Sequence, residues 1–487
     1  MRLRLDTTAA LVEKIPSLHI DAIRDRAGRK FAPVRQAYLA ELIELGYSRR
    51  RRHKTQSAAF SVSAVELIEG LHAPSETYPA IIAPILEFPP GKQGFSIEQR
   101  QTKPYRLRPE VETAAHEVFT GCSALPVVCR DTGREVMPEQ LPTNGLPADL
   151  ALPFTVPSIL PLRVSDVDRA IDRVREWIAQ TGNDYALLNR EKGDDSMTLA
   201  DAVRRLYIVR QWVQSLGGLP NFYTLQQTGR LGPTEATAHV LTLPSTLRRL
   251  LLARSGLCDF DVKACHWSIL SAVGHALGFP TEHMDDYLAH RDEWHGHLAN
   301  VTGCRYESRI KRVLLSLLNG GTLSSSPMTE NAKALGVFGM QRLSADERTQ
   351  CLYREVRHGL KALLKACQRA TVNGERLPVN ALGLTLEPAE GSRKSVEKSA
   401  RPSFQQECAH VLVGIEQVAI RAMAEKVTGL QALCYDGWIS PPQDTRPLED
   451  HARDVTTRVL GYPVSVSLTV EPFSTLVPDP DLDAADF

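Results

Sequence analysis

Several features that define other classes of protein are missing from this sequence. No apolar run reaches the roughly 18 residues of a membrane-spanning helix, and the N-terminus lacks the apolar segment of a secretory signal. Lys plus Arg and Asp plus Glu are both 57, so bulk charge does not indicate a nucleic-acid partner. The nine cysteines form no CxxC pair, which argues against a disulfide framework and predicts reduced thiols in a cytoplasmic protein.

The 487 residues allow roughly two to four domains, and 43% of them are apolar, so a sizeable core can form. Residues 47–56 form a dense basic run that fits phosphate binding or a solvated loop equally well. Residues 137–162 are rich in proline and predict a linker or an extended wrap. We therefore expect an N-terminal domain of unknown role over residues 1–160, and an acidic tail over residues 476–487.

Two helical patterns follow the proline-rich stretch. Residues 166–180 have apolar side chains at helical spacing, with Ser165 or Asp166 as the expected cap. Residues 198–216 form a second pattern that ends at Gly217 and Gly218. Together they predict an antiparallel helix pair.

Two aspartates stand where short strands are expected to end. Residues 258–262 indicate a strand that carries Asp261, and residues 430–439 indicate a hairpin with Asp436 in its turn. Two aspartates on one sheet can hold two Mg²⁺ ions, which clamp the attacking and leaving oxygens of a phosphoryl transfer. Each aspartate alone is ordinary, because turns favour this residue.

A helix is predicted between these aspartates, over residues 305–318, and two glycines end it. Lys311, Leu315 and Asn319 are four residues apart and share one face. A lysine on that face can hold a triphosphate, while Asn319 faces the nascent base pair. The ordinary alternative is a solvated, basic helix start.

The ordered set of motifs resembles the polymerase domain of family A DNA polymerases, the bacterial DNA polymerase I type, over residues 216–473. Lys311 follows Asp261 by 50 positions and precedes Asp436 by 125, similar to the family's spacing. The N-terminal third shows no such resemblance. The matching segments are residues 228–231 (Thr-Gly-Arg-Leu), residues 243–250 before motif A, residues 261–270 (motif A), residues 311–320 (motif B), residues 404–406, residues 435–437 (motif C) and the closing strand at 463–471.

The resemblance implies a role for each matching residue. Asp261, Asp436 and the backbone carbonyl of Val262 would bind two Mg²⁺ ions, with Mn²⁺ as a substitute, and Lys311 would contact the incoming triphosphate. Arg230 would contact the primer terminus, and Gln406, or Gln405 in a shifted register, the duplex. Further substrate or nucleic-acid contacts implied by the motifs are His266, Arg309, Asn319, Gly320 and Tyr435. The implied partners are a DNA template-primer and nucleoside triphosphates, with no membrane.

Departures from the family pattern affect sugar selection and triphosphate binding. His266 and Asn319 stand where DNA polymerases have the glutamate and tyrosine that exclude a ribose hydroxyl, so ribonucleotides become acceptable. Gly437 replaces the second acid of motif C, and the single-subunit phage RNA polymerases also lack an acid at that position. Glu307 replaces the motif B arginine, and Arg309 is one of several imperfect substitutes.

The predicted fold class is α+β, a right-hand polymerase with a reduced thumb. The expected divisions are a thumb-like segment at 161–217, palm at 218–270, fingers at 271–400 and palm again at 401–475. The predicted activity is template-directed nucleotidyl transfer, most simply DNA polymerisation from a primer. The alternatives are an RNA polymerase or primase on the same palm, or a nucleic-acid-binding protein whose catalytic site has decayed.

Two weaker patterns have ordinary explanations. Residues 291–298 crowd acidic and histidine side chains, but His295 and His297 should point apart on a helix, so a metal site is not expected. Of four aromatic residues that could stack on bases, Trp267 and Trp438 lie in apolar runs, whereas Tyr223 and Tyr306 lie in polar segments.

Overall fold

The computed structural model describes residues 152–182, 186–188, 197–234, 239–304, 306–372, 375–386 and 402–473, with shorter stretches before residue 152. The basic run at 47–56, the tail at 476–487 and Arg305 lie outside the described residues, so the predictions for them stay predictions. None of the described helices is both long and apolar enough to cross a membrane.

The described part of residues 1–130 has a small apolar core of its own. Leu11, Ile43, Ile85 and Val111 belong to one buried cluster. The strands pair as an antiparallel sheet, β2-β4-β3, and a ribbon, β1-β5. The elements are β1 (Leu3–Leu5), α1 (Thr8–Lys14), β2 (Phe60–Val62), α4 (Tyr78–Ile82), β3 (Leu86–Glu87), β4 (Lys103–Leu107), α5 (Pro109–Thr120) and β5 (Val127–Cys129).

The predicted helix pair is present as α6 (Val164–Thr181) and α7 (Leu199–Leu216). It is antiparallel, because Arg210 bonds to Asp168 and Arg175 bonds to Tyr207. Gly217 ends α7 with a φ of 77°, as predicted. The expected cap of α6 is wrong: the helix begins as soon as the chain leaves β6 (Ile159–Pro161), and its N-cap is Arg163.

Short strands and one helix connect this pair to the main sheet. The end of the proline-rich stretch is extended, since β6 pairs with β7 (Gly218–Pro220). Next come the hairpin of β8 (Tyr223–Leu225) and β9 (Leu231–Pro233), a short 3₁₀ turn, η4 (Val240–Thr242), and α8 (Ser245–Leu252).

A four-stranded antiparallel sheet forms the centre of the C-terminal part. Its order is β13-β14-β10-β15, built from β13 (Ala432–Leu433), β14 (Gly437–Ser440), β10 (Cys258–Lys263) and β15 (Ser467–Pro472). The strand at 258–262, the hairpin around Asp436 and the closing strand were all predicted from sequence. The closing strand is shorter than predicted at its start, because β15 begins at Ser467.

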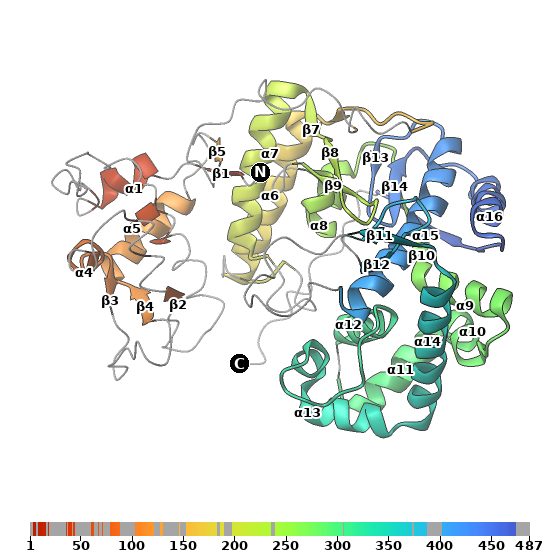
Figure 1. Ribbon diagram of the computed structural model, residues 1–487. Helices are drawn as coiled ribbons and strands as arrows, with labels where there is room; N and C mark the ends of the chain where they lie inside the picture. The colour runs from red at the N-terminus through yellow and green to blue at the C-terminus, as the bar shows by residue number, and fades with distance from the viewer. Residues whose placement is uncertain are drawn as a thin grey trace.

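The sheet lies between two apolar layers, as its alternating side chains require. Phe260 and Trp438 stack with ring centroids 5.3 Å apart and join the cluster that includes α15. Ile439 and Ala432 join the other cluster, which includes α6, α7 and α8. Figure 1 shows α6–α8 on one side of the sheet and α15 and α16 on the other.

The remaining helices form one continuous group with the sheet. They are α9 (Cys265–Leu277), α10 (Glu282–Ala289), α11 (Arg291–Thr302), α12 (Glu307–Leu318), α13 (Glu330–Ala345), α14 (Glu347–Ala366), α15 (Phe404–Lys426) and α16 (Arg446–Leu460), with a hairpin of β11 (Arg369–Val372) and β12 (Glu375–Pro378). Helices α10–α14 form the lower right of Figure 1. The structure therefore has a mixed helix and strand fold.

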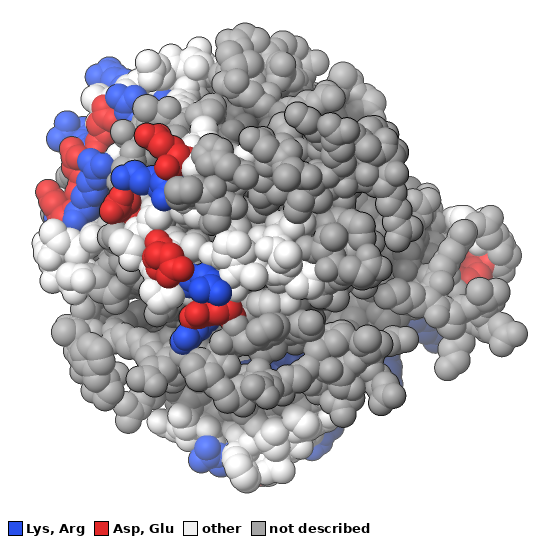
Figure 2. Space-filling model, turned by 90° about the vertical axis from the view of Figure 1, so that its left-hand side faces the viewer, with Lys and Arg blue, Asp and Glu red and all other residues white. Residues whose placement is uncertain are grey.

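Charged side chains of both signs are interspersed on the face shown in Figure 2. Where that face is described, blue and red residues stand beside one another instead of forming a single basic surface. This agrees with the formal net charge of zero. Any attraction for a polyanion must therefore come from local clusters of arginine or lysine.

Candidate active site

Asp261 and Asp436 come together at one end of the sheet. β10 and β14 are antiparallel and place Asp261 opposite Gly437, the residue after Asp436. The Val262 backbone N–H donates to the Asp436 carbonyl oxygen at 2.9 Å, which ties the turn to the strand. The two carboxyl groups hydrogen-bond to each other. Strand pairing thus joins two aspartates from distant parts of the sequence.

Gly437 permits this close pairing because it has no side chain. A Cβ atom built there would lie 1.8 Å from the Phe260 carbonyl oxygen, far inside van der Waals contact. The acid that the family pattern places at this position has no room in this packing. The close pairing of β10 and β14 therefore leaves no space for an acidic side chain at position 437.

The three acids at this end of the sheet have raised pKa values. Desolvation by the surrounding protein is the largest cause, followed by the charges of Asp436 and Asp259, and together they raise the pKa of Asp261 to about 7. Desolvation, and next the charge of Glu416, raises the pKa of Asp436. Desolvation also raises the pKa of Asp259, although Arg248, 3.7 Å away, opposes it. Both Asp261 and Asp436 are nevertheless exposed to solvent.

A left-handed residue turns the chain from β10 into α9. Ala264 has φ 51° and ψ 40°, and it is the only non-glycine residue with positive φ in the described part of the chain. Such a conformation costs an alanine roughly 1–2 kcal/mol. The sharp turn puts His266 on the first turn of α9, directly beside the strand that carries Asp261.

His266 and Arg230 both bind one buried carboxylate. Glu416 on α15 has a side chain only 1% exposed. His266 Nε2 lies 2.7 Å from Glu416 Oε2, and an Arg230 Nη lies 2.7 Å from both carboxylate oxygens. Burial by itself raises the pKa of Glu416, but the bond to His266 and the charges of His266 and Arg230 outweigh it and hold the pKa below its usual range.

Three further contacts hold the Thr228–Arg230 turn in place. The Asn380 side chain donates to the Thr228 carbonyl oxygen at 2.9 Å, and Arg421 donates to the Gly229 carbonyl oxygen at 2.8 Å. The Arg230 guanidinium also stacks on the Tyr435 ring, 5.4 Å from its centroid. Gln417 donates to the Tyr435 carbonyl oxygen at 3.1 Å. Arg230 and Tyr435 are therefore positioned by α15, next to the aspartate pair.

Sequence reasoning missed Glu416 and Asn380. Glu416 is one acid within the apolar run of a long helix, and such an isolated buried charge is expected to have a partner. The sequence therefore predicts that Glu416 has a positively charged partner, but it does not identify that partner. Nothing local in the sequence links Asn380 to the turn at Thr228.

Lys311 lies on α12, as predicted, and is 52% exposed. Its ammonium pairs with Glu307 one helical turn away, at 2.8 Å. Glu307 also accepts from His295 at 2.9 Å. No contact between Lys311 and either aspartate is present among the described residues, so its role as a triphosphate ligand stays a prediction.

The other predicted residues of α12 occupy its two ends. Arg309 lies over the Tyr306 ring, 4.9 Å from its centroid. The Asn319 side chain donates to the Leu315 carbonyl oxygen at 3.1 Å, at the helix C-terminus. Gly320 has φ 79°, and a Cβ there would lie 2.8 Å from Phe404 at the start of α15. The two glycines end the helix as predicted, and Gly320 leaves room for the Phe404 side chain.

Gln406 caps α15 in this structure. The Ser403 backbone N–H donates to its Oε1 at 2.8 Å, and the Gln406 N–H donates to Ser403 Oγ at 3.3 Å. This reciprocal pair is a capping box, which satisfies two donors at the helix start. Gln405 is exposed beside it. Contact of either glutamine with a duplex stays a prediction.

The structure also places the four aromatic residues and the two histidines of the weaker sequence patterns. Tyr223 lies in a polar segment, yet it is 4% exposed, and its hydroxyl donates to Asn221 at 2.6 Å, so it cannot stack on a base. Trp267 and Trp438 are buried, and Tyr306 is 45% exposed. His295 and His297 bind different acids, Glu307 and Asp346, as their helical spacing predicts.

The carboxylate pair fits a divalent cation of the Mg²⁺ class. The charge of Asp436 raises the pKa of Asp261, as expected for two neighbouring carboxyl groups that repel each other when both are ionised. Hard oxygen ligands of this kind suit Mg²⁺ or Mn²⁺. Two arginines near the pair form ion pairs with other acids: Arg230 pairs with Glu416, and Arg248 pairs with Asp259. Within the described residues no group of three or more His, Cys, Asp or Glu is arranged to hold a metal, so any cation would need backbone, water or substrate oxygens as well.

Comparison with known proteins finds a distant structural likeness and no match in sequence. No protein-family model matches the chain, and no curated protein matches it. Among solved structures, the chain is similar to the POL domain of Pol1 from M. smegmatis, a protein solved in complex with DNA primer-template and dNTP. The TM-score is 0.37 at 13% sequence identity, over 65% of this chain and 67% of that one.

Proposed function

We propose that this protein is a template-directed nucleotidyltransferase, and specifically a primer-extending DNA polymerase of the family A type. The observation that carries the proposal is the pairing of Asp261 with Asp436 at the exposed end of an antiparallel sheet. The order and spacing of the surrounding motifs support it. In this proposal the sheet and α15 are the palm, α10–α14 the fingers, and α6–α7 a reduced thumb.

Each residue of the site has a definite task under this proposal. Asp261 and Asp436 hold Mg²⁺, which when bound would neutralise charge on the reacting phosphate oxygens. The Val262 N–H fixes the Asp436 turn so that both carboxylates face the same point. Arg230 and Tyr435, positioned by α15, lie beside the pair, where a primer terminus would sit. Lys311 would leave Glu307 for the triphosphate. Positioning and electrostatics of this kind account for most of phosphoryl-transfer catalysis.

A second candidate, polymerisation of ribonucleotides, is favoured by one observation. His266 binds Glu416 through Nε2, and its Nδ1 is buried without a hydrogen-bond partner among the described residues. If the imidazole turned about its side-chain bonds, this nitrogen would face the site, where it could bond a ribose hydroxyl. Under this alternative the same two aspartates serve an RNA polymerase or primase.

The test is a primer-extension assay with Mg²⁺, given either deoxynucleotides or ribonucleotides, with and without a primer. We expect deoxynucleotide extension by the wild type and a loss of at least a hundredfold in Asp436→Asn and Asp261→Asn, because each removes a metal ligand. Asp292→Asn is the matched control: it changes an exposed aspartate on α11 and should extend like the wild type.

The other outcomes separate the alternatives. Product from ribonucleotides without a primer would replace the DNA polymerase proposal with a primase or RNA polymerase. No product in any lane, with template still retained in a gel shift, would leave a nucleic-acid-binding protein without catalysis. Equal activity in Asp436→Asn and the wild type would refute the aspartate-pair mechanism.

A further inference from the structure

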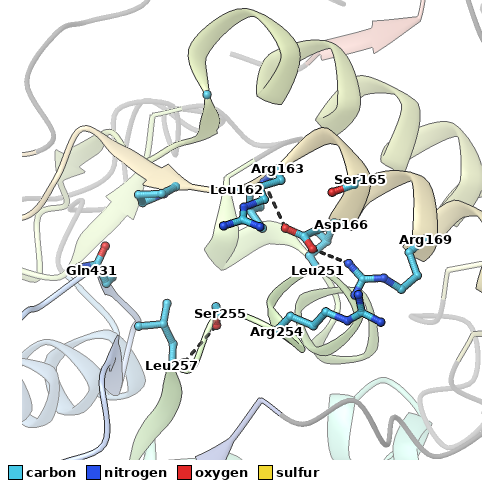
Figure 3. Close-up of a pocket in the computed structure, with 12 residues that line it drawn as sticks. Leu162, Arg163, Ser165, Asp166, Arg169, Leu251, Arg254, Ser255, Leu257 and Gln431 are labelled. Carbon is cyan, nitrogen blue, oxygen red and sulfur yellow. Dashed lines mark hydrogen bonds and ion pairs between the residues drawn. The ribbon is translucent and has the colours of Figure 1, made fainter.

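A cavity of about 640 Å³ lies between the start of α6 and the end of α8. Its wall includes Arg163 and Arg169 from the first turns of α6, Arg254 just after α8, and Leu257 and Gln431, which precede β10 and β13. Figure 3 shows these side chains around one opening, with Arg169 and Arg254 extending toward the same end of it. A cavity of this size can hold a nucleotide-sized ligand.

The wall of this cavity carries an excess of positive charge. Three arginines face one acid, Asp166. Asp166 already accepts from the Arg163 backbone N–H at 3.2 Å and pairs with the Arg169 guanidinium. The guanidinium groups of Arg163 and Arg254 have no hydrogen bond or ion pair with any described residue. Both residues are exposed, so two cations remain available to a ligand.

The side chains, and not the helix end, supply this attraction. The first turn of α6 is occupied by the Asp166 carboxylate, which caps the Arg163 N–H. Two arginines on separate elements can instead contact separate oxygens of an anion. Guanidinium groups match phosphate oxygens in geometry and charge, so a phosphate ester is the expected ligand class.

The cavity lies at the opposite end of β10 from the aspartate pair. Leu257 precedes the strand and Asp261 is four residues further along it, which is about 13 Å at the rise of a β-strand. Neighbouring phosphates of one nucleic-acid strand are about 3.4 Å apart along a helix axis. A strand held at the aspartates can therefore reach the cavity within about four nucleotides.

We propose that this arginine-lined cavity binds the phosphodiester backbone of a single nucleic-acid strand that also passes the aspartate pair. The inference rests on the proposed function for the identity of the strand. None of the residues lining the cavity is aromatic, so it offers no platform for stacking a base. That composition favours recognition of the backbone over recognition of a free nucleotide, and it makes the contact independent of sequence.

The experiment measures binding of a fluorescent single-stranded 20-mer in EDTA, over a series of salt concentrations. Each phosphate contact contributes about 0.7 to the slope of log affinity against log salt for a single strand. We expect the double variant Arg163→Gln, Arg254→Gln to lower the steepness of that slope by about 1.4. Arg169 is left unchanged because it pairs with Asp166. Circular dichroism checks that the variant is folded.

The matched control removes two exposed arginines from α16, in Arg453→Gln, Arg458→Gln. It should keep the wild-type slope. If the cavity variant also keeps it, the proposal is overturned. A second arm measures tripolyphosphate binding by calorimetry. Loss of that binding in the cavity variant, with an unchanged oligonucleotide slope, would assign the cavity to a free polyphosphate and overturn the strand assignment.

The readout is independent of catalysis. Binding is measured without Mg²⁺, so it can succeed even if no lane of the primer-extension assay gives product. Conversely, a protein that extends primers but shows the same salt slope in both double variants would keep the proposed function and lose this inference.

Discussion

Asp261 and Glu416 belong to the same candidate site, but their pKa values shift in opposite directions. Asp261 is exposed, yet desolvation and, next, neighbouring acids raise its pKa to about 7. Glu416 is buried, yet His266 and Arg230 keep its pKa below the ordinary value. Desolvation raises both pKa values, and the charges around each group then decide the outcome: acids add to the shift of Asp261, whereas His266 and Arg230 reverse that of Glu416.

The raised pKa of Asp261 predicts how stability depends on pH in the absence of metal. An acid of raised pKa binds its proton more tightly in the folded state, so stability falls as the pH rises from about 4 to about 7 and is flat above. Asp261→Asn removes this loss. We expect the variant to be more stable than the wild type at pH 8 by about 1–2 kcal/mol, a value reduced for solvent screening.

Urea unfolding in EDTA at pH 5 and pH 8 measures this difference. The difference in the free energy of unfolding between the variant and the wild type should grow from pH 5 to pH 8, because ionisation of Asp261 destabilises only the wild type. Asp292→Asn should follow the wild type at both. An advantage that is equal at pH 5 and pH 8 would show that Asp261 does not carry the shift.

Glu416→Gln tests whether one carboxylate positions both Arg230 and His266. The amide keeps the size of the side chain but leaves a partly buried guanidinium without its counter-charge, and breaking such a pair is strongly destabilising. We expect a loss of about 2–3 kcal/mol in the free energy of unfolding. Glu425→Gln, at an exposed position of the same helix, should change it by less than about 0.5 kcal/mol.

Chemical denaturation gives the stability, and primer extension gives the positioning effect. A KM for the primer that rises in Glu416→Gln, with both variants folded, is the result expected if Arg230 contacts the primer end. Equal denaturation curves for the two glutamate variants would mean that Glu416 does not hold Arg230 and His266 in place.

At the scale of elements, the pairing of β10 with β14 decides the geometry of the site. The strands lie so close that Gly437 has no space for a side chain. The same approach places the Val262 N–H on the Asp436 carbonyl oxygen. The positions of both carboxylates therefore depend on a residue that has no functional group of its own.

Gly437→Ala should consequently damage both stability and activity. The added methyl group forces β10 and β14 apart, at a cost of about 2–3 kcal/mol. We expect primer extension to fall at least tenfold at temperatures where the variant remains folded. Thermal unfolding and primer extension measure the two effects.

Gly296→Ala is the control for the glycine substitution. Gly296 lies within α11, and nothing stands within 4 Å of a Cβ built there. Alanine in a helix interior is favoured over glycine by about 0.5–1 kcal/mol, so this variant should gain stability. A Gly437→Ala variant that unfolds at the wild-type temperature would show that the strands are not packed as described.

At the scale of the whole molecule, the sheet is covered on both faces and open at its end. Clusters of buried side chains from α6–α8 and from α9 and α15 pack against its two faces. The aspartate pair is at the exposed end of β10, and the arginine-lined cavity is at the beginning of that strand. The formal net charge of the chain is zero, so the attraction of a polyanion depends on local features such as this cavity.

Local patterns predicted much of the secondary structure and part of the site. The helices α6, α7 and α12, the strand β10 and the hairpin at Asp436 follow from apolar periodicity, glycine and turn residues. Tyr223 was misjudged because burial depends on β13, far along the chain, whose Leu433 backbone bonds to its hydroxyl. The cap of α6 was misplaced because β6 sets where that helix begins.

The sequence by itself determined which elements form, since spacing and turn residues act over a few neighbours, and it pointed to Asp261 and Asp436 as a pair. Only the tertiary structure decided what surrounds them. The partnership of Arg230 and His266 with Glu416 joins residues more than 100 positions apart. The absence of space at Gly437 and the cavity between α6 and α8 likewise arise from packing. Such contacts depend on how distant segments fold together, and no local pattern encodes them.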